Sequence, residues 1–200
     1  MVKFGIDLDG VCFDWQYFVD WHNRIYGTSF TKKEFLSPDF LSKYGISPKA
    51  WDRVVSKMYK TVGTRNLPPA QGAVVGVKQL SKIGRTLAIT ARPPWAHDDT
   101  IHWLRANFNR TLYRDFKFTK NRHIISQTEH LPTKLEVCIS EGVDYLFEDD
   151  INYSLPCAEK DVKVLLFDYQ GDKSGLHGNI HPVYSWPEAV AKVRELEGIN

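Results

Sequence analysis

Residues 3–10 read KFGIDLDG, and they carry the strongest indication of the fold in this sequence. An apolar run ends in two acids, Asp7 and Asp9, which lie two residues apart and are followed at once by Gly10. A short hydrophobic segment that ends in carboxylates is typical of a buried strand in a parallel sheet, with its charged end at the rim of the sheet. Asp7 and Asp9 are therefore candidates for chemistry.

Five segments of the chain are short, apolar and rich in β-forming residues, and stretches of helical character separate most of them. These predicted strands cover residues 2–7, 85–90, 113–118, 143–148 and 161–167. The predicted helices cover residues 14–27, 47–62, 73–84, 98–108, 133–143 and 185–198, whereas residues 119–132 and 171–182 are predicted to be loops. The alternation of strands and helices predicts an α/β protein with a parallel sheet.

About 75 residues separate the first two predicted strands, far more than a crossover helix requires. Residues 15–70 are therefore expected to form a small helical cap, while residues 1–14 and 71–200 form the core domain. Ser47 is expected to cap the second helix of this insertion, and Pro48 is expected to occupy the first helical position.

The composition of the 200-residue chain is that of a soluble globular protein, since apolar residues make up 42% and charged residues 25%. A net charge of +2, without a long block of basic residues, disfavours a nucleic-acid partner. No apolar stretch approaches the length of a membrane helix and the N-terminus has no leader-like pattern, so a cytoplasmic protein without a membrane partner is expected. Cys12, Cys138 and Cys157 are far apart and are expected to be reduced packing residues.

Polar side chains follow three of the predicted strands at the point where each strand ends. Besides Asp7 and Asp9, these are Thr90 and Arg92 after the second strand and Glu148, Asp149 and Asp150 at the fourth, while Lys134 opens the preceding helix. Residues just beyond the carboxyl ends of adjacent parallel strands converge in one crevice. Several carboxylates gathered there repel one another unless a cation holds them together, and a set made of oxygen ligands favours Mg²⁺.

The run of acids at 148–150 leaves two interpretations of this metal site open. If the fourth strand ends at Phe147, Glu148 and Asp149 are the pair at the metal. If the strand extends one residue further, Asp149 and Asp150 take this place. Asp149 belongs to both pairs.

The motifs follow a characteristic order along the chain. "DLDGV" at the end of the first strand, "TAR" at the second, a lysine, and an "ED" pair at the fourth resemble, in that order, the four motifs of the haloacid-dehalogenase-like phosphatases. The resemblance covers nearly the whole chain. It implies a Rossmann-like, three-layer α/β/α sheet with a helical cap of the C1 type inserted after the first strand.

The resemblance also implies a role for each motif residue. Asp7 would attack a phosphoryl group, and Asp9 would act first as an acid and then as a base. The residues that would bind the phosphate are Thr90, Ala91 and Lys134. The groups that would hold Mg²⁺ are Asp7, the backbone carbonyl of Asp9, Glu148 and Asp149. An aspartyl-phosphate divides hydrolysis into two easier steps, while lysine and metal together neutralise the transferred charge.

Further stretches look like the 5′(3′)-deoxyribonucleotidase branch of this superfamily: "DLDGVCFDW", the helical insertion, "TARPP" and "VYSWPEAV". That similarity implies nucleoside monophosphates as substrates, with bases stacked on aromatic residues of the cap. Phe13, Trp15 and Arg92 are the candidate pocket residues. An aromatic stripe at helical spacing is also the pattern of a cap core, and both interpretations stay open for Phe13, Trp15, Phe18, Trp21, Phe30 and Tyr44.

The favoured function is a Mg²⁺-dependent phosphomonoester hydrolase, a 5′-nucleotidase acting on small (deoxy)nucleoside monophosphates. A phosphatase of another small metabolite or of nucleic-acid ends is the alternative among enzymes, although an inserted lid limits access to small ligands. The alternative outside enzymes is a non-catalytic phosphate-binding module, which has no need of an acid two residues past the nucleophile. The sequence leaves a homodimer open.

Overall fold

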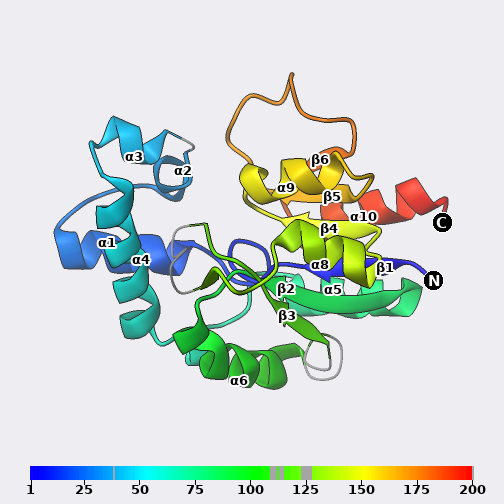
Figure 1. Ribbon diagram of the computed structural model, residues 1–200, viewed down its shortest axis with the longest axis horizontal. Coiled ribbons are helices and arrows are strands. Elements are labelled where there is room, and N and C mark those ends of the chain that lie inside the picture. The colour runs from blue at the N-terminus through cyan, green and yellow to red at the C-terminus, as the bar shows by residue number, and fades with distance from the viewer. Residues whose placement is uncertain (38, 109–111, 113–114, 123–127, 200) are drawn as a thin grey trace.

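A parallel sheet forms the centre of the molecule (Figure 1). The computed structural model describes the chain except for residues 38, 109–111, 113–114, 123–127 and 200. Within this part, six strands are ordered β3-β2-β1-β4-β5-β6, and every neighbouring pair is parallel. The strands are β1 (Lys3–Ile6), β2 (Arg85–Thr90), β3 (Phe116–Phe118), β4 (Tyr145–Glu148), β5 (Lys163–Phe167) and β6 (Ile180–Val183). The predicted Rossmann-like α/β fold is confirmed.

The helices that were predicted are all present. They are α1 (Gln16–Tyr26), α4 (Pro48–Val62), α5 (Ala73–Ile83), α6 (His97–Phe108), α8 (Lys134–Glu141) and α10 (Trp186–Glu197). The structure adds α2 (Lys32–Phe35), α3 (Phe40–Lys43), α9 (Ile151–Ala158) and two 3₁₀ turns, η1 (Thr64–Asn66) and η2 (Pro94–Ala96). As predicted, the Ser47 hydroxyl caps α4 by accepting from the backbone N–H of Ala50, and Pro48 occupies the first turn.

One loop prediction is wrong over its last three residues. Residues 171–182 were expected to be a loop, but β6 begins at Ile180 and pairs with β5 at the edge of the sheet. Pro182 obscures this strand in the sequence, yet an edge strand tolerates proline because one side of its backbone needs no partner. The loop predicted over residues 119–132 lies partly outside the described residues, since 123–127 are not among them.

Two apolar clusters cover the two faces of the sheet and make three layers. Side chains alternate along each strand, so one set of strand residues packs with α5, α6 and α10 and the other with α8 and α9. The first set includes Phe4, Ile6, Ala88, Phe147 and Leu165. The second set includes Leu87, Ile89, Leu146, Val164 and Leu166. The three cysteines are free and buried, as expected.

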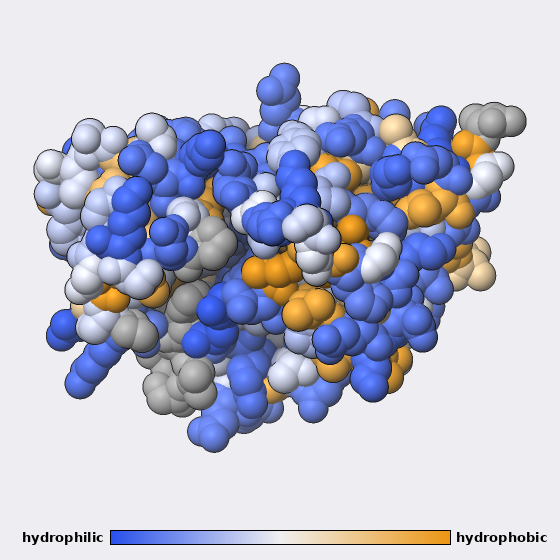
Figure 2. Space-filling view, turned by 90° about the horizontal axis from the view of Figure 1, so that it is seen from above, coloured by the Kyte–Doolittle hydropathy of each residue, from blue (hydrophilic) through white to orange (hydrophobic). Residues whose placement is uncertain are grey.

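The helices α1 to α4 lie to one side of the sheet, on the left in Figure 1, between β1 and α5 in the sequence. We call residues 16–66 the helical insertion. Its apolar residues continue the same cluster that covers one face of the sheet. Figure 2 shows a face of the molecule on which hydrophilic residues predominate and hydrophobic ones form small groups. Among the described residues, no helix is both long enough and apolar enough to cross a membrane.

Candidate active site

The candidate site lies where β1, β2 and β4 end, beside a pocket of about 430 Å³. Strand order reverses between β1 and β4, and this is where open parallel sheets bind ligands. Beyond β1, the backbone N–H of Asp7 still donates to the carbonyl of Phe147 at 2.9 Å. The ladder therefore holds Asp7 against β4 and aims its carboxylate at the rim.

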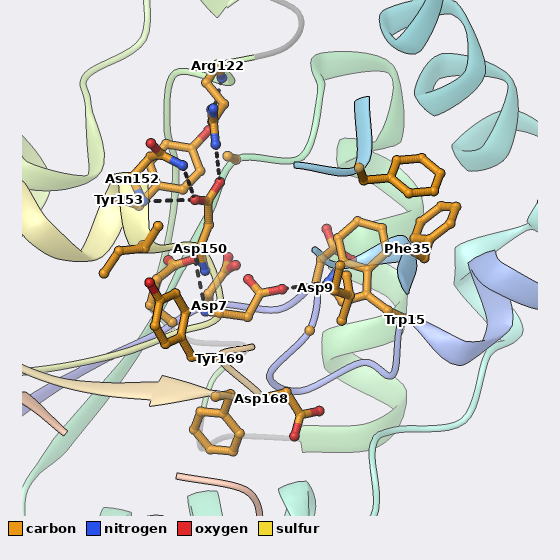
Figure 3. Close-up of a pocket in the computed structure, with 18 of the residues that line it drawn as sticks. Asp7, Asp9, Trp15, Phe35, Arg122, Asp150, Asn152, Tyr153, Asp168 and Tyr169 are labelled. Carbon is orange, nitrogen blue, oxygen red and sulfur yellow. Dashed lines mark hydrogen bonds and ion pairs between the residues drawn. The ribbon is translucent and has the colours of Figure 1, made fainter. Parts of the chain in front are cut away.

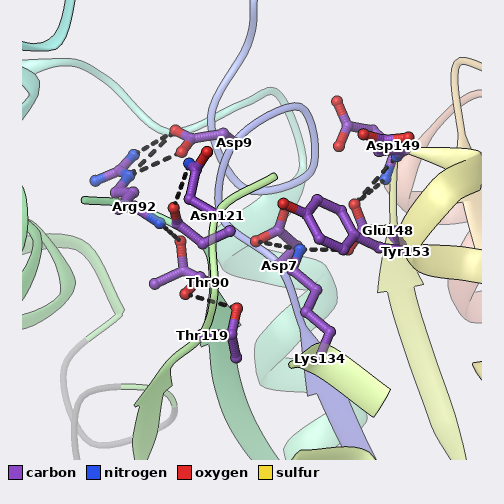
Figure 4. A network of polar contacts seen from close by, with 12 residues as sticks. Asp7, Asp9, Thr90, Arg92, Thr119, Asn121, Lys134, Glu148, Asp149 and Tyr153 are labelled. Atoms are coloured by element: carbon purple, nitrogen blue, oxygen red, sulfur yellow. Dashed lines mark hydrogen bonds and ion pairs between the residues drawn. The ribbon is translucent and has the colours of Figure 1, made fainter. Parts of the chain in front are cut away.

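Asp7 shares one buried cation with Glu148. The Lys134 ammonium lies 2.5 Å from Glu148 Oε2 and 3.1 Å from Asp7 Oδ1, and all three side chains are about 90% buried or more. Lys134 is the first residue of α8, where Thr133 and Glu136 form a capping box that fixes the start of the helix. Figure 4 shows the lysine reaching between the two carboxylates.

These charges displace the pKa values of the site. Burial raises the pKa of Asp7 to about 8, although the charge of Lys134 opposes this rise. Burial and the charges of Glu148 and Asp7 raise the pKa of Asp149 well above its ordinary value. Burial acts to lower the pKa of Lys134, but Asp7 and Glu148 outweigh it and hold the ammonium charged. The raised pKa values indicate that Asp7, Glu148 and Asp149, if all were ionised, would carry more negative charge than the one lysine balances.

A divalent cation fits this arrangement. Oxygen atoms of Asp7, Glu148 and Asp149 all lie within 4.8 Å of one another. Asp7 Oδ1 is buried and accepts no hydrogen bond in the described part of the chain. Its described charged partner is the Lys134 ammonium, with which it forms an ion pair. When ionised, these three carboxylates, of which Asp7 and Glu148 are buried, carry more negative charge than one ammonium balances, and a hard ion bound by oxygen ligands would neutralise the excess.

Asp149 also binds Trp15, the residue just before the helical insertion. The indole N–H of Trp15 donates to Asp149 Oδ2 at 2.6 Å. Gly10 makes room for this contact: it adopts a φ of +78°, and a Cβ atom there would lie 1.9 Å from the same oxygen. The glycine that follows the two acids is therefore required both by its left-handed backbone and by the approach of Asp149.

The Asp150 side chain points away from the carboxylate cluster. β4 extends to Glu148, and a strand of that length was expected to place Asp149 and Asp150 at the metal site. The Asp150 carboxylate caps α9 through the backbone N–H of Asn152 and pairs with Arg122 at 2.8 Å. Although burial opposes it, the Arg122 guanidinium lowers the pKa of Asp150. The three-carboxylate cluster contains Glu148 and Asp149 because the capping geometry takes Asp150 away from it.

Asp9 accepts hydrogen bonds from two side chains, one from the core domain and one from the helical insertion. The Arg92 guanidinium, fully buried after β2, contacts Asp9 through Nε at 3.1 Å and through a terminal nitrogen at 2.8 Å. The Tyr59 hydroxyl, on α4, donates to Asp9 Oδ2 at 2.6 Å. Burial and the charge of Asp9 raise the pKa of Tyr59, so this hydroxyl keeps its proton.

The predicted phosphate-binding residues lie next to this network. Thr90 ends β2, and its hydroxyl accepts from the backbone N–H of Arg92 at 3.3 Å. Ala91 lines the pocket, and its carbonyl accepts from the Asn121 side chain at 2.7 Å. The three predicted phosphate-binding residues therefore lie at the same edge of the sheet as Asp7: Thr90, Ala91 and Lys134.

The predicted pocket residues are placed differently from one another. Trp15 lines the pocket, whereas Phe13 is fully buried and Arg92 is directed to Asp9 and to the Thr100 hydroxyl. Of the other aromatic residues considered, Phe18 and Trp21 are buried and Tyr44 is exposed.

The aromatic wall of the pocket comes largely from residues that the sequence analysis missed. They are Phe35, Phe40, Trp51 and Tyr59, all from the helical insertion. In α4, Trp51, Val55 and Tyr59 recur at a spacing of four residues and all face the pocket. That spacing is visible in the sequence. Figure 3 shows Trp15 and Phe35 on one side of the pocket and Asn152, Tyr153 and Tyr169 on the other.

Comparison with known proteins shows similarity to nucleotidases. The family described as "5' nucleotidase, deoxy (Pyrimidine), cytosolic type C protein" matches residues 1–132. "Putative nucleotidase YqfW" of Bacillus subtilis is 25% identical over 193 residues, which cover 95% of this chain and 92% of that protein.

Solved structures share the fold. A predicted phosphatase from Clostridium acetobutylicum has a TM-score of 0.66 at 14% identity, covering 97% of this chain and 98% of that one. The HAD-hydrolase YfnB from Bacillus subtilis, bound to magnesium, has a TM-score of 0.61 at 7% identity, covering 99% of both chains. At these identities the likeness establishes the three-layer fold.

Proposed function

The chain belongs to the cytosolic type C family of deoxy (pyrimidine) 5′-nucleotidases, within the haloacid-dehalogenase-like phosphatases, and we propose on this premise that it is a Mg²⁺-dependent 5′-nucleotidase. It hydrolyses (deoxy)nucleoside 5′-monophosphates through an aspartyl-phosphate on Asp7. One observation carries the proposal: Asp7 lies beside Lys134 and the carboxylates of Glu148 and Asp149, while Asp9, two residues on, is held in a separate network.

The reaction divides between the two aspartates of the first motif. In the first step a carboxylate oxygen of Asp7 attacks phosphorus, the bond from phosphorus to the ester oxygen breaks, and Asp9 gives its proton to that oxygen. In the second step Asp9 takes a proton from water, whose oxygen attacks phosphorus and releases the Asp7 carboxylate. Asp9 thereby returns to its starting protonation state.

The remaining motif residues bind and neutralise the phosphate. Lys134 supplies an ammonium next to Asp7, and Thr90 and Ala91 offer donors at the same rim. Asp7, Glu148 and Asp149, with the carbonyl of Asp9, would hold Mg²⁺. When bound, the ion supplies positive charge that counters the repulsion between these carboxylates and the phosphate.

A nucleoside is the group that best matches the pocket. About 430 Å³ is within the range for small-molecule sites. The aromatic wall of Phe35, Phe40 and Trp51 offers faces on which a base can stack, and the opposite wall is polar. We further propose that residues 15–70 form a cap over the core domain of residues 1–14 and 71–200, and that this cap restricts the site to small substrates. The proposed location of the protein is the cytoplasm.

Phosphate release from a panel of substrates tests this proposal. The panel contains dTMP, dUMP, UMP, glucose 6-phosphate and a 3′-phosphorylated oligonucleotide, each with Mg²⁺ or with a chelator. We expect Mg²⁺-dependent turnover of the nucleoside monophosphates and its loss in Asp7→Asn. Asp172→Asn, in an exposed loop where Asp172 bonds only Ser174 among the described partners, serves as the matched control and keeps its activity.

Other outcomes point to the alternatives. Preference for the oligonucleotide or for the sugar phosphate would replace the nucleotidase by a phosphatase of that class. A wild-type protein that binds phosphate but hydrolyses nothing in the panel would be a binding module.

A further inference from the structure

The side chain of Tyr59 crosses from the helical insertion to the acid of the first motif. Tyr59 lies near the end of α4 and is 50 residues from Asp9 in the sequence, yet its hydroxyl lies 2.6 Å from Asp9 Oδ2. The side chain is buried. No motif considered in the sequence analysis includes this residue.

The ring of Tyr59 is fixed on two sides. It packs edge-on against Phe18 of α1 with ring centres 5.3 Å apart, and against Trp95 of η2 at 5.8 Å. One contact is from the insertion and the other from the segment that follows β2. The hydroxyl is therefore aimed at Asp9 by packing and not only by its hydrogen bond.

Arg92 of the core also binds the Asp9 carboxylate. Arg92 binds Oδ1 and Oδ2 through Nε and Oδ1 again through a terminal nitrogen, as Figure 4 shows. The other terminal nitrogen of Arg92 donates to Thr100, which anchors the guanidinium. Among the described side chains, Asp9 Oδ1 accepts hydrogen bonds from Arg92, whereas Oδ2 accepts from both Arg92 and the Tyr59 hydroxyl. Without the Tyr59 hydroxyl, Arg92 is the one described side-chain donor that still holds the carboxylate.

We propose that Tyr59 is a positioning residue for the acid–base step: its hydroxyl fixes the orientation in which Asp9 protonates the leaving group. This rests on the proposed function. Tyr59 gives and takes no proton. Because Tyr59 lies on α4, its hydrogen bond to Asp9 forms only when α4 lies against the core.

Dependence on the leaving group separates this role from a structural one. A nucleoside alkoxide needs the proton of Asp9 in order to leave, whereas 4-nitrophenolate leaves without it. The phosphoryl transfer to Asp7 is otherwise the same for both substrates. A misoriented Asp9 therefore slows the nucleotide far more than the aryl ester.

The test is kcat/KM of Tyr59→Phe with dTMP and with 4-nitrophenyl phosphate, because this constant reports the first chemical step. Phenylalanine keeps the ring contacts and removes only the hydroxyl. We expect a loss of about 10–100-fold with dTMP, the range for a lost hydrogen bond to a charged group, and less than about 3-fold with the aryl ester.

Tyr145→Phe is the matched control. Its hydroxyl also binds a carboxylate, that of Glu197, but on the far side from the pocket, so neither substrate is affected. Thermal unfolding of both variants checks that they fold. A second measurement uses Asp9→Asn: adding Tyr59→Phe to it costs nothing further, since the group to be positioned is already inactive.

Three results would overturn the inference. Equal losses on both substrates, or an additional loss in the Asp9→Asn background, would make Tyr59 a structural residue. An unchanged Tyr59→Phe would show that Arg92 suffices. If the wild type hydrolyses neither substrate, the proposed function fails first, and the inference fails with it.

Discussion

Replacing Lys134 with methionine tests the electrostatic balance of the site directly. The methionine side chain has nearly the same length and leaves the packing of α8 intact, but it removes the charge that lies 3.1 Å from Asp7 and 2.5 Å from Glu148. Both carboxylates are buried at the base of the pocket, so water compensates only partly for the lost ammonium. The variant therefore keeps the buried carboxyl groups of Asp7 and Glu148, next to half-buried Asp149, without a described cation.

The expected cost follows from the burial of the pair. Removing one partner of a buried ion pair costs about 3–5 kcal/mol of unfolding free energy. For a domain of this size each kcal/mol lowers the midpoint by about 2–4 °C, so we expect a drop of about 6–20 °C. The drop is smaller at pH 6 than at pH 8.5, because the pKa of Asp7 is already raised to about 8 and rises further without Lys134. A protonated Asp7 relieves the repulsion.

Thermal unfolding in a chelator, followed by circular dichroism at both pH values, measures this loss. Lys117→Met is the control: Lys117 pairs with Glu141 at 2.7 Å on the edge strand β3, with its side chain 41% exposed. An exposed pair of this kind contributes about 0–1 kcal/mol, so its midpoint changes little.

A drop of less than about 3 °C for Lys134→Met at pH 8.5, or a drop equal to that of Lys117→Met, would refute the reasoning. It would mean that Asp7 and Glu148 do not depend on this ammonium. A larger drop at pH 6 than at pH 8.5 would contradict the proposed uptake of a proton by Asp7.

Two further predictions concern the same cluster. In the metal-free protein, burial raises the pKa of Asp7 to about 8 from 3.8, so the folded state holds a proton that the unfolded state has lost. The unfolding free energy therefore falls as pH rises from about 4 to 8, and Asp7→Asn flattens this slope in thermal scans. Trp15→Phe removes the donor to Asp149, and we expect about 10-fold more Mg²⁺ to be needed for half-maximal activity, with kcat at saturating Mg²⁺ little changed.

Each of these predictions has a result that contradicts it. Stability that rises with pH over this window, in wild type but not in Asp7→Asn, would show that Asp7 is ionised in the folded metal-free protein. A Trp15→Phe variant with unchanged Mg²⁺ activation would show that the indole does not orient Asp149.

Local patterns in the sequence were sufficient for the fold and for the family. The apolar run before Asp7 and the alternation of strand and helix depend on residues close in sequence, so they predict a parallel sheet with Asp7 at its rim. The order of the four motifs indicated the superfamily, which the family match and the relatives confirm. Because β6 is short and contains Pro182, its local pattern did not distinguish it from a loop.

Tertiary structure alone decided where the site's side chains point and which of them meet. Arg92 looked like a pocket residue, but the packing around it turns its guanidinium to Asp9. Asp150 shares a run of acids with Asp149, yet its carboxylate pairs with Arg122, which is 28 residues away in the sequence. Tyr59 reaches Asp9 across 50 residues because α4 packs against the core. Local sequence sets the position of a residue along a strand or helix, whereas the direction and partner of its side chain depend on contacts with segments distant in sequence.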